Sequence, residues 1–316
     1  MIAILLATYN GEKYIRDQID SILYQSFSAF RLYISDDCST DKTLDILNEY
    51  VKKDNRVHVV SQKENIGHLK NFEYLLRNVK EEIIFLSDQD DVWYNDKIEK
   101  TLNFYNHNNV SLVHTDLEVV DQSFKTINKS MFKGRHLIDN KIKGGKFSDY
   151  ILENRATGCT MCFHREILDI ALPFSEEMQV HDWWLAICAF KYRGVKVFNE
   201  PTIKYRQHDR NTIGYNSLAK LVNLEFKKEL MERNSYESYI SRKKDFFKEC
   251  NNRLDCFNDI DVKKVKECNM FFESIHNKRP KLSEYIKIYK EQTFMYKVYS
   301  FVLIYVLFKR VNKENV

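Results

Sequence analysis

Residues 82–93 read EIIFLSDQDDVW, and this stretch decides the predicted fold. Its apolar run at residues 83–86 has the length of a buried strand in a parallel sheet, and it ends abruptly in polar residues. Three carboxylates follow within four positions, at Asp88, Asp90 and Asp91. The stretch therefore predicts a buried strand with concentrated negative charge at its carboxyl end.

Carboxylates this close in sequence repel one another and raise each other's pKa, so the cluster suggests a compensating cation. Oxygen ligands without a neighbouring Cys or His favour Mg²⁺ or Mn²⁺, which complete their shells with water and substrate phosphate. The alternative is a solvated acidic turn that caps the helix predicted to begin near Asn95 and Asp96. The pattern of the sequence before this cluster favours a bound cation over a capping turn.

The segment before this stretch repeats one pattern. Apolar runs at residues 2–7, 30–35 and 57–60 each precede a turn signal and then apolar residues at helical spacing. Strand and helix thus alternate, which predicts an α/β fold with a doubly wound, mainly parallel sheet and right-handed crossovers. In such sheets the ligand lies beyond the carboxyl ends of the strands.

Polar residues gather at those predicted strand ends, at residues 8–12, Asp36, Asp37, Asn65 and residues 88–91. The sequence contains no G-x-G-x-x-G and no G-x-x-x-x-G-K-[ST], which excludes the usual Rossmann dinucleotide and P-loop sites. Phosphate must be neutralised in another way, and a metal ion on the Asp cluster would do so. The remaining carboxylates and the Asn can accept hydrogen bonds from a base and a ribose.

Composition indicates a compact chain. Its 316 residues are 44% hydrophobic with only 8 Gly and 3 Pro, which predicts one large domain plus an appendage and few flexible linkers. Met1 runs directly into a strand-like segment and the chain has 7 Cys, so we expect a reducing, cytoplasmic setting. Cys159 and Cys162 form a lone CxxC, which we interpret as part of a buried strand rather than a metal or redox pair.

Seven short motifs follow one another along the chain. They read ATYNGEKYI (7–15), SDDCSTDKT (35–43), NIG with Asn71 (65–71), SDQDDVW (87–93), TGCTMCFHR (157–165), VHDWWLA (180–186) and YRQHDRN (205–211). In this order they resemble family 2 glycosyltransferases with a GT-A fold, especially the bacterial rhamnosyltransferase-like branch. The resemblance covers roughly the first two thirds of the chain.

The resemblance implies roles for residues at the strand ends. The pyrimidine nucleoside of a nucleotide-sugar donor would be held by Thr8, Tyr9, Glu12, Asp36 and Asn65. Among them, Asp36 would accept a hydrogen bond from N3–H of the base.

The resemblance also implies a metal site. Asp88 and Asp90 would be the DxD pair, with Asp88 also close to the donor and Asp90 the direct ligand of Mg²⁺ or Mn²⁺. His208 would be a further metal ligand or a hydrogen-bond donor to the diphosphate, while a structural role for this lone His is the alternative. Cys38 departs from the family, which usually has Gly there, and the departure concerns the fine geometry of that turn and not its acidic residues.

Residues 1–217 are expected to form the catalytic domain, with a nucleotide-sugar half at 1–110 and an acceptor half at 111–217. In the acceptor half, residues 111–120 and 157–164 read as strands, and the polar, basic segment 124–146 reads as a loop.

Asp182 begins a predicted helix in this half, where a carboxylate can act as N-cap. The resemblance implies instead that Asp182 is the general base, which is needed because an alcohol is a poor nucleophile. His181 would tune this base. Trp183, Thr157 and Gly158 would face the acceptor or the sugar, with Trp183 offering a flat apolar ring.

Composition changes after residue 217. Residues 218–316 carry 21 Lys and Arg against 14 Asp and Glu, whereas the preceding residues carry 28 against 31. Helical spacing predicts a small helical region here. Residues 296–310 contain a largely apolar run of eleven residues with basic flanks, too short to span a bilayer. They predict a helix at the membrane interface, or alternatively a core or oligomer helix.

We therefore expect an inverting glycosyltransferase that takes a sugar from dTDP-rhamnose or a UDP-hexose. The acceptor would be a glycan or lipid-linked molecule in bacterial surface polysaccharide synthesis, reached from the cytoplasmic face of the membrane by peripheral contact, with no nucleic acid partner. A nucleotidyltransferase is one alternative, although its usual Gly-rich, Lys/Arg-containing N-terminal loop is missing. A non-catalytic nucleotide-sugar-binding protein is the other.

Overall fold

The computed structural model describes residues 1–132, 145–152, 154–175, 178, 180–208, 233–277 and 282–289. The nucleotide-sugar half contains β1 (Ile2–Thr8), α1 (Ile15–Leu23), β2 (Phe30–Asp36), α2 (Thr43–Lys53), β3 (Val57–Ser61), α3 (His68–Asn78), β4 (Ile83–Ser87), β5 (Val92–Trp93) and α4 (Lys97–Asn108). The following half contains β6 (Leu112–Val120), β7 (Thr126–Asn128), α6 (Phe147–Ile151), the 3₁₀ turn η1 (Gly158–Thr160), β8 (Met161–His164), η2 (Arg165–Ile167), α7 (Leu168–Ala171), α8 (His181–Cys188), η3 (Ala189–Lys191) and β9 (Val195–Arg206).

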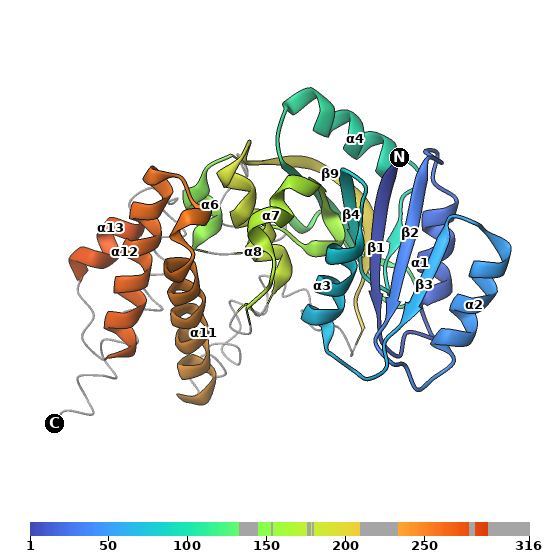
Figure 1. Cartoon of the computed structure of the whole chain (residues 1–316), viewed down its shortest axis with the longest axis horizontal. Helices are drawn as coiled ribbons and strands as arrows, with labels where there is room; N and C mark the ends of the chain where they lie inside the picture. Colours follow the sequence, from blue (N-terminus) through green and yellow to red (C-terminus); the bar gives the residue numbers. More distant parts are fainter. Residues whose placement is uncertain are drawn as a thin grey trace.

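One sheet runs through both halves, in the strand order β3-β2-β1-β4-β8-β6-β9-β5, with β7 paired to β6 (Figure 1). Strands β3, β2, β1 and β4 are all parallel, which confirms the predicted alternation of strand and helix. Their carboxyl ends therefore lie along one edge. Because β1 is buried on both faces, its sequence is a continuous apolar run rather than an alternating one.

The second part of the sheet is mixed. β8 runs antiparallel to both β4 and β6, β9 runs parallel to β6, and β5 runs antiparallel to β9. The expected strand at residues 157–164 is shorter than predicted, since it begins as η1 and becomes β8 only at Met161. The prediction of a mainly parallel sheet thus describes the first half better than the second.

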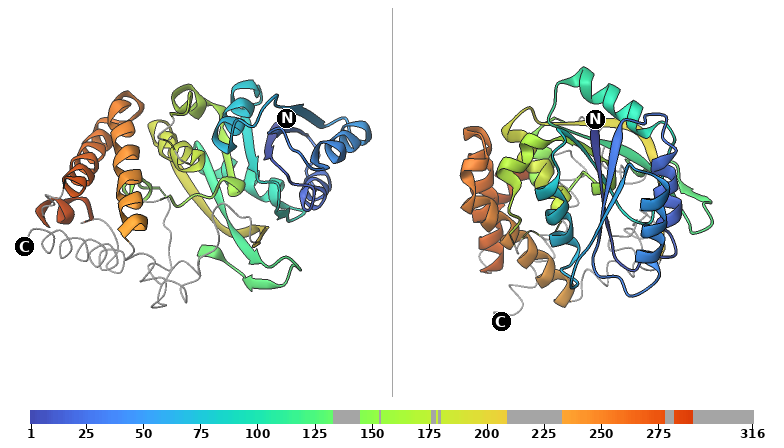
Figure 2. Two further views of the ribbon diagram at one scale, coloured as in Figure 1. Left: turned by 90° about the horizontal axis from the view of Figure 1, so that it is seen from below. Right: turned by 45° about the vertical axis from the view of Figure 1, so that its right-hand side comes forward.

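Helices cover both faces of the sheet, as expected for a doubly wound fold (Figure 2). On one face, apolar residues of α1, α2 and α4 pack on alternate side chains of β1, namely Ile2, Ile4 and Leu6. On the other face, α3 and α8 pack on the intervening side chains, Ala3 and Leu5. The two cores hold the strand ends in fixed relative positions.

Three further helices are α11 (Arg233–Asn252), α12 (Asp259–His276) and α13 (Leu282–Tyr289). In Figure 1 they lie at the opposite end of the molecule from α2 and β3, with α8 between them and the sheet. Phe246 stacks on Trp183 with 3.8 Å between ring centroids, and Lys191 Nζ donates to the backbone oxygens of Asp255 and Phe257. These helices share one hydrophobic core with α8, so they are more closely integrated than the expected appendage.

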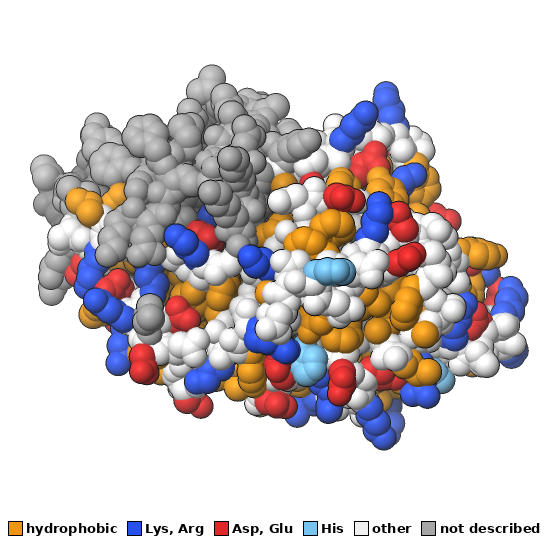
Figure 3. Space-filling view, turned by 90° about the horizontal axis from the view of Figure 1, so that it is seen from above, with side chains coloured by type: hydrophobic (Ala, Val, Ile, Leu, Met, Phe, Trp, Pro, Cys, Tyr) orange, Lys and Arg blue, Asp and Glu red, His pale blue; other side chains and the backbone are white. Residues whose placement is uncertain are grey.

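The expected domain boundary at residue 217 and the membrane-interface helix at 296–310 lie outside the described residues. Among the helices that the structure describes, none has the length and apolar character to cross a membrane. Lys and Arg side chains are interspersed with Asp and Glu over the described part of the face shown in Figure 3.

Candidate functional site

The carboxyl ends of β1 and β4 are joined by the side chain of Gln89. Its Oε1 accepts hydrogen bonds from Thr8 Oγ1 at 2.6 Å and from the Tyr9 backbone N–H at 2.9 Å. A Cβ added at Gly11 would lie 2.6 Å from the same oxygen, so a side chain there would displace Gln89. Thr8 and Tyr9 lie at the predicted edge, whereas the role of Gln89, the residue between Asp88 and Asp90 of the predicted DxD pair, was not predicted from the sequence.

Asp36 at the end of β2 is fully buried. Its carboxylate accepts hydrogen bonds from the backbone N–H and the hydroxyl of Ser39, and from Ser61 Oγ at 3.3 Å. These contacts show that Asp36 shapes its own turn. A carboxylate can accept about four hydrogen bonds, so one from a nucleobase could be added to these three.

The other predicted donor residues lie on the surface of the same edge. Glu12 is exposed, and its Oε2 accepts from the Lys42 backbone N–H at 3.1 Å, at the start of α2. Asn65 is also exposed, in a loop held by Asp37, whose carboxylate accepts from the backbone N–H groups of Ile66 and Gly67. The structure thus brings Glu12 and Asn65 to the predicted edge without fixing either side chain inside a pocket.

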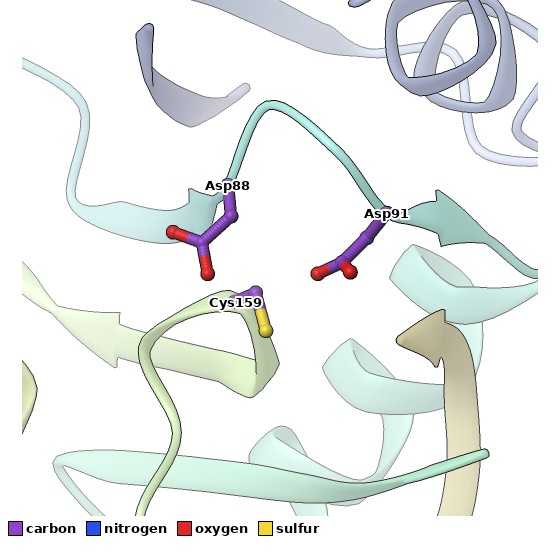
Figure 4. Close-up of side chains that lie close together, drawn as sticks. All are labelled: Asp88, Asp91 and Cys159. Atoms are coloured by element: carbon purple, nitrogen blue, oxygen red, sulfur yellow. The ribbon is translucent and has the colours of Figure 1, made fainter. Parts of the chain in front are cut away.

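The acidic cluster continues inward from this edge. One oxygen each of Asp88 and Asp91 and the sulfur of Cys159 lie within 4.8 Å of one another (Figure 4). Asp91 is fully buried and accepts from the Arg206 backbone N–H at 3.1 Å, while its Oδ2 has no hydrogen-bond partner in the described part of the chain. Burial, followed by repulsion from Asp90, raises the pKa of Asp88 to about 7.

Asp90 points to a different partner. Its Oδ2 lies 2.8 Å from Nε2 of His208, although 118 residues separate the two in sequence. The His208 ring stacks on Tyr14 with 4.6 Å between centroids. The structure therefore brings together Asp90 and His208, which sequence analysis assigned to one metal site.

The side chains of this cluster offer ligand atoms that fit a hard divalent cation. The unpartnered oxygen of buried Asp91 and the raised pKa of Asp88 both indicate negative charge that is not fully compensated. Burial raises the pKa of the Cys159 thiol well above its usual value, so the sulfur is neutral and a poor metal ligand. The carboxylate oxygens that remain as ligands suit Mg²⁺ or Mn²⁺.

One buried cation already lies beneath the cluster. Lys97 is fully buried at the start of α4, and its Nζ donates to Thr202 Oγ1 at 3.2 Å. Burial lowers the pKa of this lysine to about 8, against the attraction of groups that include Cys159 and Asp91. Nothing in the sequence distinguishes Lys97 from the many surface lysines, so its role could not be predicted.

Asp182 is held in place by three hydrogen bonds. Oδ1 accepts from Asn154 Nδ2 at 2.8 Å and from the Trp183 backbone N–H at 2.6 Å, and Oδ2 accepts from the Gly158 backbone N–H at 3.0 Å. The N-cap of α8 is Val180, so Asp182 is not the capping residue, which was the alternative to its role as base, and its carboxylate lies in the first turn. Burial raises the pKa of Asp182 to about 6 despite these hydrogen bonds.

The η1 turn connects Asp182 with the acidic cluster. Gly158 contacts Asp182 through its backbone N–H, while the next residue, Cys159, contributes its sulfur to the group with Asp88 and Asp91. The carbonyl oxygen of Thr157 closes the turn by accepting from the Thr160 backbone N–H at 2.9 Å. Gly158 therefore contacts the predicted base, while the contact of Thr157 and Gly158 with the acceptor or the sugar stays a prediction.

Trp183 does not offer a ring to a sugar. It is 8% exposed, its ring stacks on Phe246, and its Nε1 donates to the backbone oxygen of Tyr150 at 2.7 Å. All eight residues of α8 are buried, so the helix has no solvent-facing side. The prediction that Trp183 contacts the acceptor is wrong because the C-terminal helices cover this ring.

Comparison with known proteins decides the family. Residues 3–170 match the family model for Glycosyl transferase family 2. The chain belongs to this family. It is 30% identical over 224 residues to the dTDP-rhamnosyl transferase RfbG of Shigella flexneri, covering 67% of this chain and 74% of that protein. This similarity confirms the resemblance to the rhamnosyltransferase-like branch.

Two further similarities involve other members and a solved structure. The family 2 chain is 25% identical over 201 residues to the UDP-Glc:alpha-D-GlcNAc-diphosphoundecaprenol beta-1,3-glucosyltransferase WfgD of Escherichia coli, covering 63% of this chain and 73% of that protein. The structure of S. aureus TarS 1–349 in complex with UDP-GlcNAc superposes with a TM-score of 0.57 at 17% identity, covering 87% of this chain and 90% of that one. The GT-A fold is thereby confirmed.

Proposed function

We propose that this family 2 glycosyltransferase is an inverting enzyme in which Asp182 is the general base. The observation that carries the proposal is the η1 turn, where consecutive residues contact Asp182 and the acidic cluster. A base must reach the acceptor hydroxyl while the donor diphosphate is held nearby, and this turn supports both requirements. The raised pKa of Asp182, about 6, suits a carboxylate that takes a proton near neutral pH.

The residues of the chain have distinct parts in this mechanism. Asp182 accepts the proton of an acceptor hydroxyl as the oxygen attacks the anomeric carbon, and the bond from that carbon to the diphosphate breaks on the opposite side. The configuration at the anomeric carbon is therefore inverted. Asn154 and the Gly158 N–H fix the orientation of the Asp182 carboxylate by hydrogen bonds. This matters because a small displacement of a catalytic group lowers the reaction rate strongly.

Asp88, Asp90 and His208 are the residues that would hold Mg²⁺ or Mn²⁺. The ion would neutralise the diphosphate of the donor and of the departing nucleotide. The proposal is supported by the 2.8 Å contact between Asp90 and His208 and by the uncompensated charge around Asp88. A mannosyltransferase of the same fold, PcManGT from Pyrobaculum calidifontis, has been solved with GDP-Man and Mn²⁺, with a TM-score of 0.52 at 13% identity and coverage of 98% of this chain and 86% of that one.

The proposed donor is dTDP-rhamnose or a UDP-hexose. The names of RfbG and WfgD indicate these two classes of donor, and Thr8, Tyr9, Glu12, Asp36 and Asn65 line the edge where the nucleoside would bind. The proposed acceptor is a glycan or lipid-linked molecule of a bacterial surface polysaccharide, as the name of WfgD suggests for that protein.

We also propose that residues 296–310 bring the enzyme to the cytoplasmic face of the membrane. The support is their sequence, in which an apolar run has basic flanks. Deletion of residues 297–316 should move the protein from the membrane fraction to the soluble fraction without slowing transfer to a soluble acceptor. Unfolding of the shortened protein would instead identify this segment as a core helix.

A donor panel tests the proposed activity. Thermal unfolding should be measured with Mn²⁺ and dTDP-rhamnose, UDP-glucose or UDP-GlcNAc, because a ligand at 100 times its Kd stabilises a protein by about 2.7 kcal/mol. A stabilising donor should then be hydrolysed slowly without acceptor, releasing the nucleoside diphosphate. Release of pyrophosphate would identify a nucleotidyltransferase, and binding without any turnover would identify a non-catalytic module.

A further inference from the structure

His181, the first residue of α8, is a buried side chain without hydrogen bonds. It is 4% exposed, and neither ring nitrogen has a hydrogen-bond partner among the described residues. Buried polar groups are almost always hydrogen-bonded, because burial removes the water that would otherwise satisfy them. An imidazole left in this state next to a proposed catalytic base requires an explanation.

Apolar packing, rather than hydrogen bonding, fixes the ring. Phe72 stacks on it with 4.2 Å between centroids, and the His68 ring lies 5.2 Å away at a tilted angle. Burial lowers the pKa of His181 well below its usual value, so the ring is neutral and offers one donor and one acceptor nitrogen. The packing thus orients an uncharged imidazole whose two nitrogens have no hydrogen-bond partner among the described residues.

Gly158 lies against one of these nitrogens. A Cβ at this position would lie 3.2 Å from His181 Nε2, 3.6 Å from Asp182 Cβ and 3.7 Å from Asp182 Oδ2. Gly158 begins a 3₁₀ turn and does not have the left-handed backbone conformation that favours glycine. A side chain at this position would therefore press on the imidazole and contact the base, so glycine allows the two to lie close together.

We propose that Nε2 of His181 binds a sugar hydroxyl group beside Asp182 and so positions the sugar for reaction. The inference rests on the proposed function and adds a specificity-determining residue to it. A hydroxyl fits because it can donate to or accept from a neutral imidazole, whichever nitrogen carries the proton. The hydroxyl belongs either to the sugar of the donor or to the acceptor, and the two sources have different consequences.

The test compares His181→Phe, which keeps a flat ring but removes both nitrogens, with His181→Gln, whose carboxamide can replace Nε2 in a hydrogen bond. His58→Phe on β3 is the matched control, since His58 is exposed and away from the site. Calorimetry with Mn²⁺ should measure Kd for UDP, UDP-glucose, dTDP and dTDP-rhamnose. Thermal unfolding of each variant should be measured alongside.

If the hydroxyl belongs to the donor, His181→Phe should weaken nucleotide-sugar binding by about tenfold and leave binding of the free nucleoside diphosphate unchanged. If it belongs to the acceptor, donor binding and donor hydrolysis should be retained while kcat/KM for the acceptor falls about tenfold. In either case His181→Gln should recover part of the loss, and His181→Phe should unfold at the wild-type temperature or higher.

The inference is overturned if His181→Phe retains donor binding and acceptor kcat/KM, since the imidazole would then be packing alone. It is also overturned if His181→Gln is as impaired as His181→Phe at equal stability. Should His181→Phe fail to fold, His181→Leu against His181→Gln gives the same comparison. A wild-type protein that binds and hydrolyses no nucleotide sugar would contradict the proposed function instead.

Discussion

The backbone N–H of Gly158 donates a 3.0 Å hydrogen bond to Oδ2 of Asp182, which lies 24 residues further along the chain. The following residue, Cys159, packs against the carboxylates of Asp88 and Asp91. One tight turn therefore fixes the proposed base relative to the proposed metal site. Because such geometry is sensitive to small displacements, substitutions around the turn should change turnover more than stability.

Asp182→Asn should lower kcat by at least ~100-fold, because it removes the proton acceptor while keeping the shape of the side chain. Donor Kd should stay near the wild-type value, since the proposed nucleotide contacts lie at the ends of β1 and β2. The Asn oxygen can still accept hydrogen bonds from Asn154 and the Trp183 N–H. Its NH₂ group then faces the Gly158 N–H, and two donors cannot bond, so the free energy of unfolding should fall by about 1–3 kcal/mol. Steady-state kinetics and calorimetry would measure both effects.

Asp169→Asn on α7 is the matched control, because Asp169 is exposed and outside the site. It should leave kcat and Kd unchanged. Loss of donor binding in Asp182→Asn would place this carboxylate in the nucleotide site, and an unchanged kcat would mean that another group is the base.

The pH dependence of kcat should follow the ionisation of Asp182. A general base acts only in its deprotonated form, and burial raises the pKa of this carboxyl to about 6. At saturating donor and acceptor, kcat should therefore rise with pH through an apparent pKa of about 6 and level off above it. The residual activity of Asp182→Asn should lack this rise, and a rise that persists in the variant would belong to a different group.

Asp90→Asn and His208→Ala should each reduce metal-dependent turnover by roughly 10–100-fold or more, because both side chains would hold the ion. Adding Mn²⁺ should raise the unfolding temperature of the wild type, and this shift should shrink in both variants. His107→Ala, at an exposed position on α4, is the control. Full activity of the wild type in EDTA would contradict the metal site.

The sequence predicted the first part of the fold well, because the strand, turn and helix signals of β1 to β4 are all local. It could not give the strand directions of the second part. β8 is buried on both faces whether it runs parallel or antiparallel, so its apolar pattern carries no information about direction. Similarly, the change of composition after residue 217 indicated helices but not that Phe246 would pack on Trp183.

For the site, strand ends indicated the acidic cluster, and the resemblance supplied the distant residues Asp182 and His208. Asn154 and Gln89 were missed because a single polar residue in a loop gives no sign of its partner. The buried helix α8 shows another limit. Apolar residues on every side of a helix indicate that the helix is buried, but not which side faces a ligand. Trp183 was therefore predicted on the ligand-facing side of α8, whereas it faces the C-terminal helices.

Trp183→Leu should therefore lower stability without changing recognition of the acceptor. The substitution removes the stacking on Phe246 and the hydrogen bond from Nε1 to the Tyr150 carbonyl, at a cost of about 2–5 kcal/mol. Chemical denaturation would measure this loss. KM for the acceptor, determined well below the unfolding temperature, should stay within about twofold of wild type. A tenfold increase in KM at retained stability would restore the sugar-stacking role.

Gly158→Ala should lower turnover while leaving the fold intact. The new methyl group would lie 3.2 Å from His181 Nε2, so this ring must shift by a few tenths of an ångström, next to Asp182, whose Oδ2 would be in contact with the methyl group at 3.7 Å. Since a misplacement of about 1 Å can cost ~100-fold in rate, we expect kcat to fall ~10-fold or more.

Gly194→Ala is the control and should affect stability rather than turnover, because φ at Gly194 is +76° and alanine would be strained there. That variant should lose about 1 kcal/mol of stability or more but keep its kcat. Equal effects of both substitutions on stability, with no specific loss of turnover in Gly158→Ala, would mean that the close packing of Gly158 on His181 and Asp182 does not matter for the reaction.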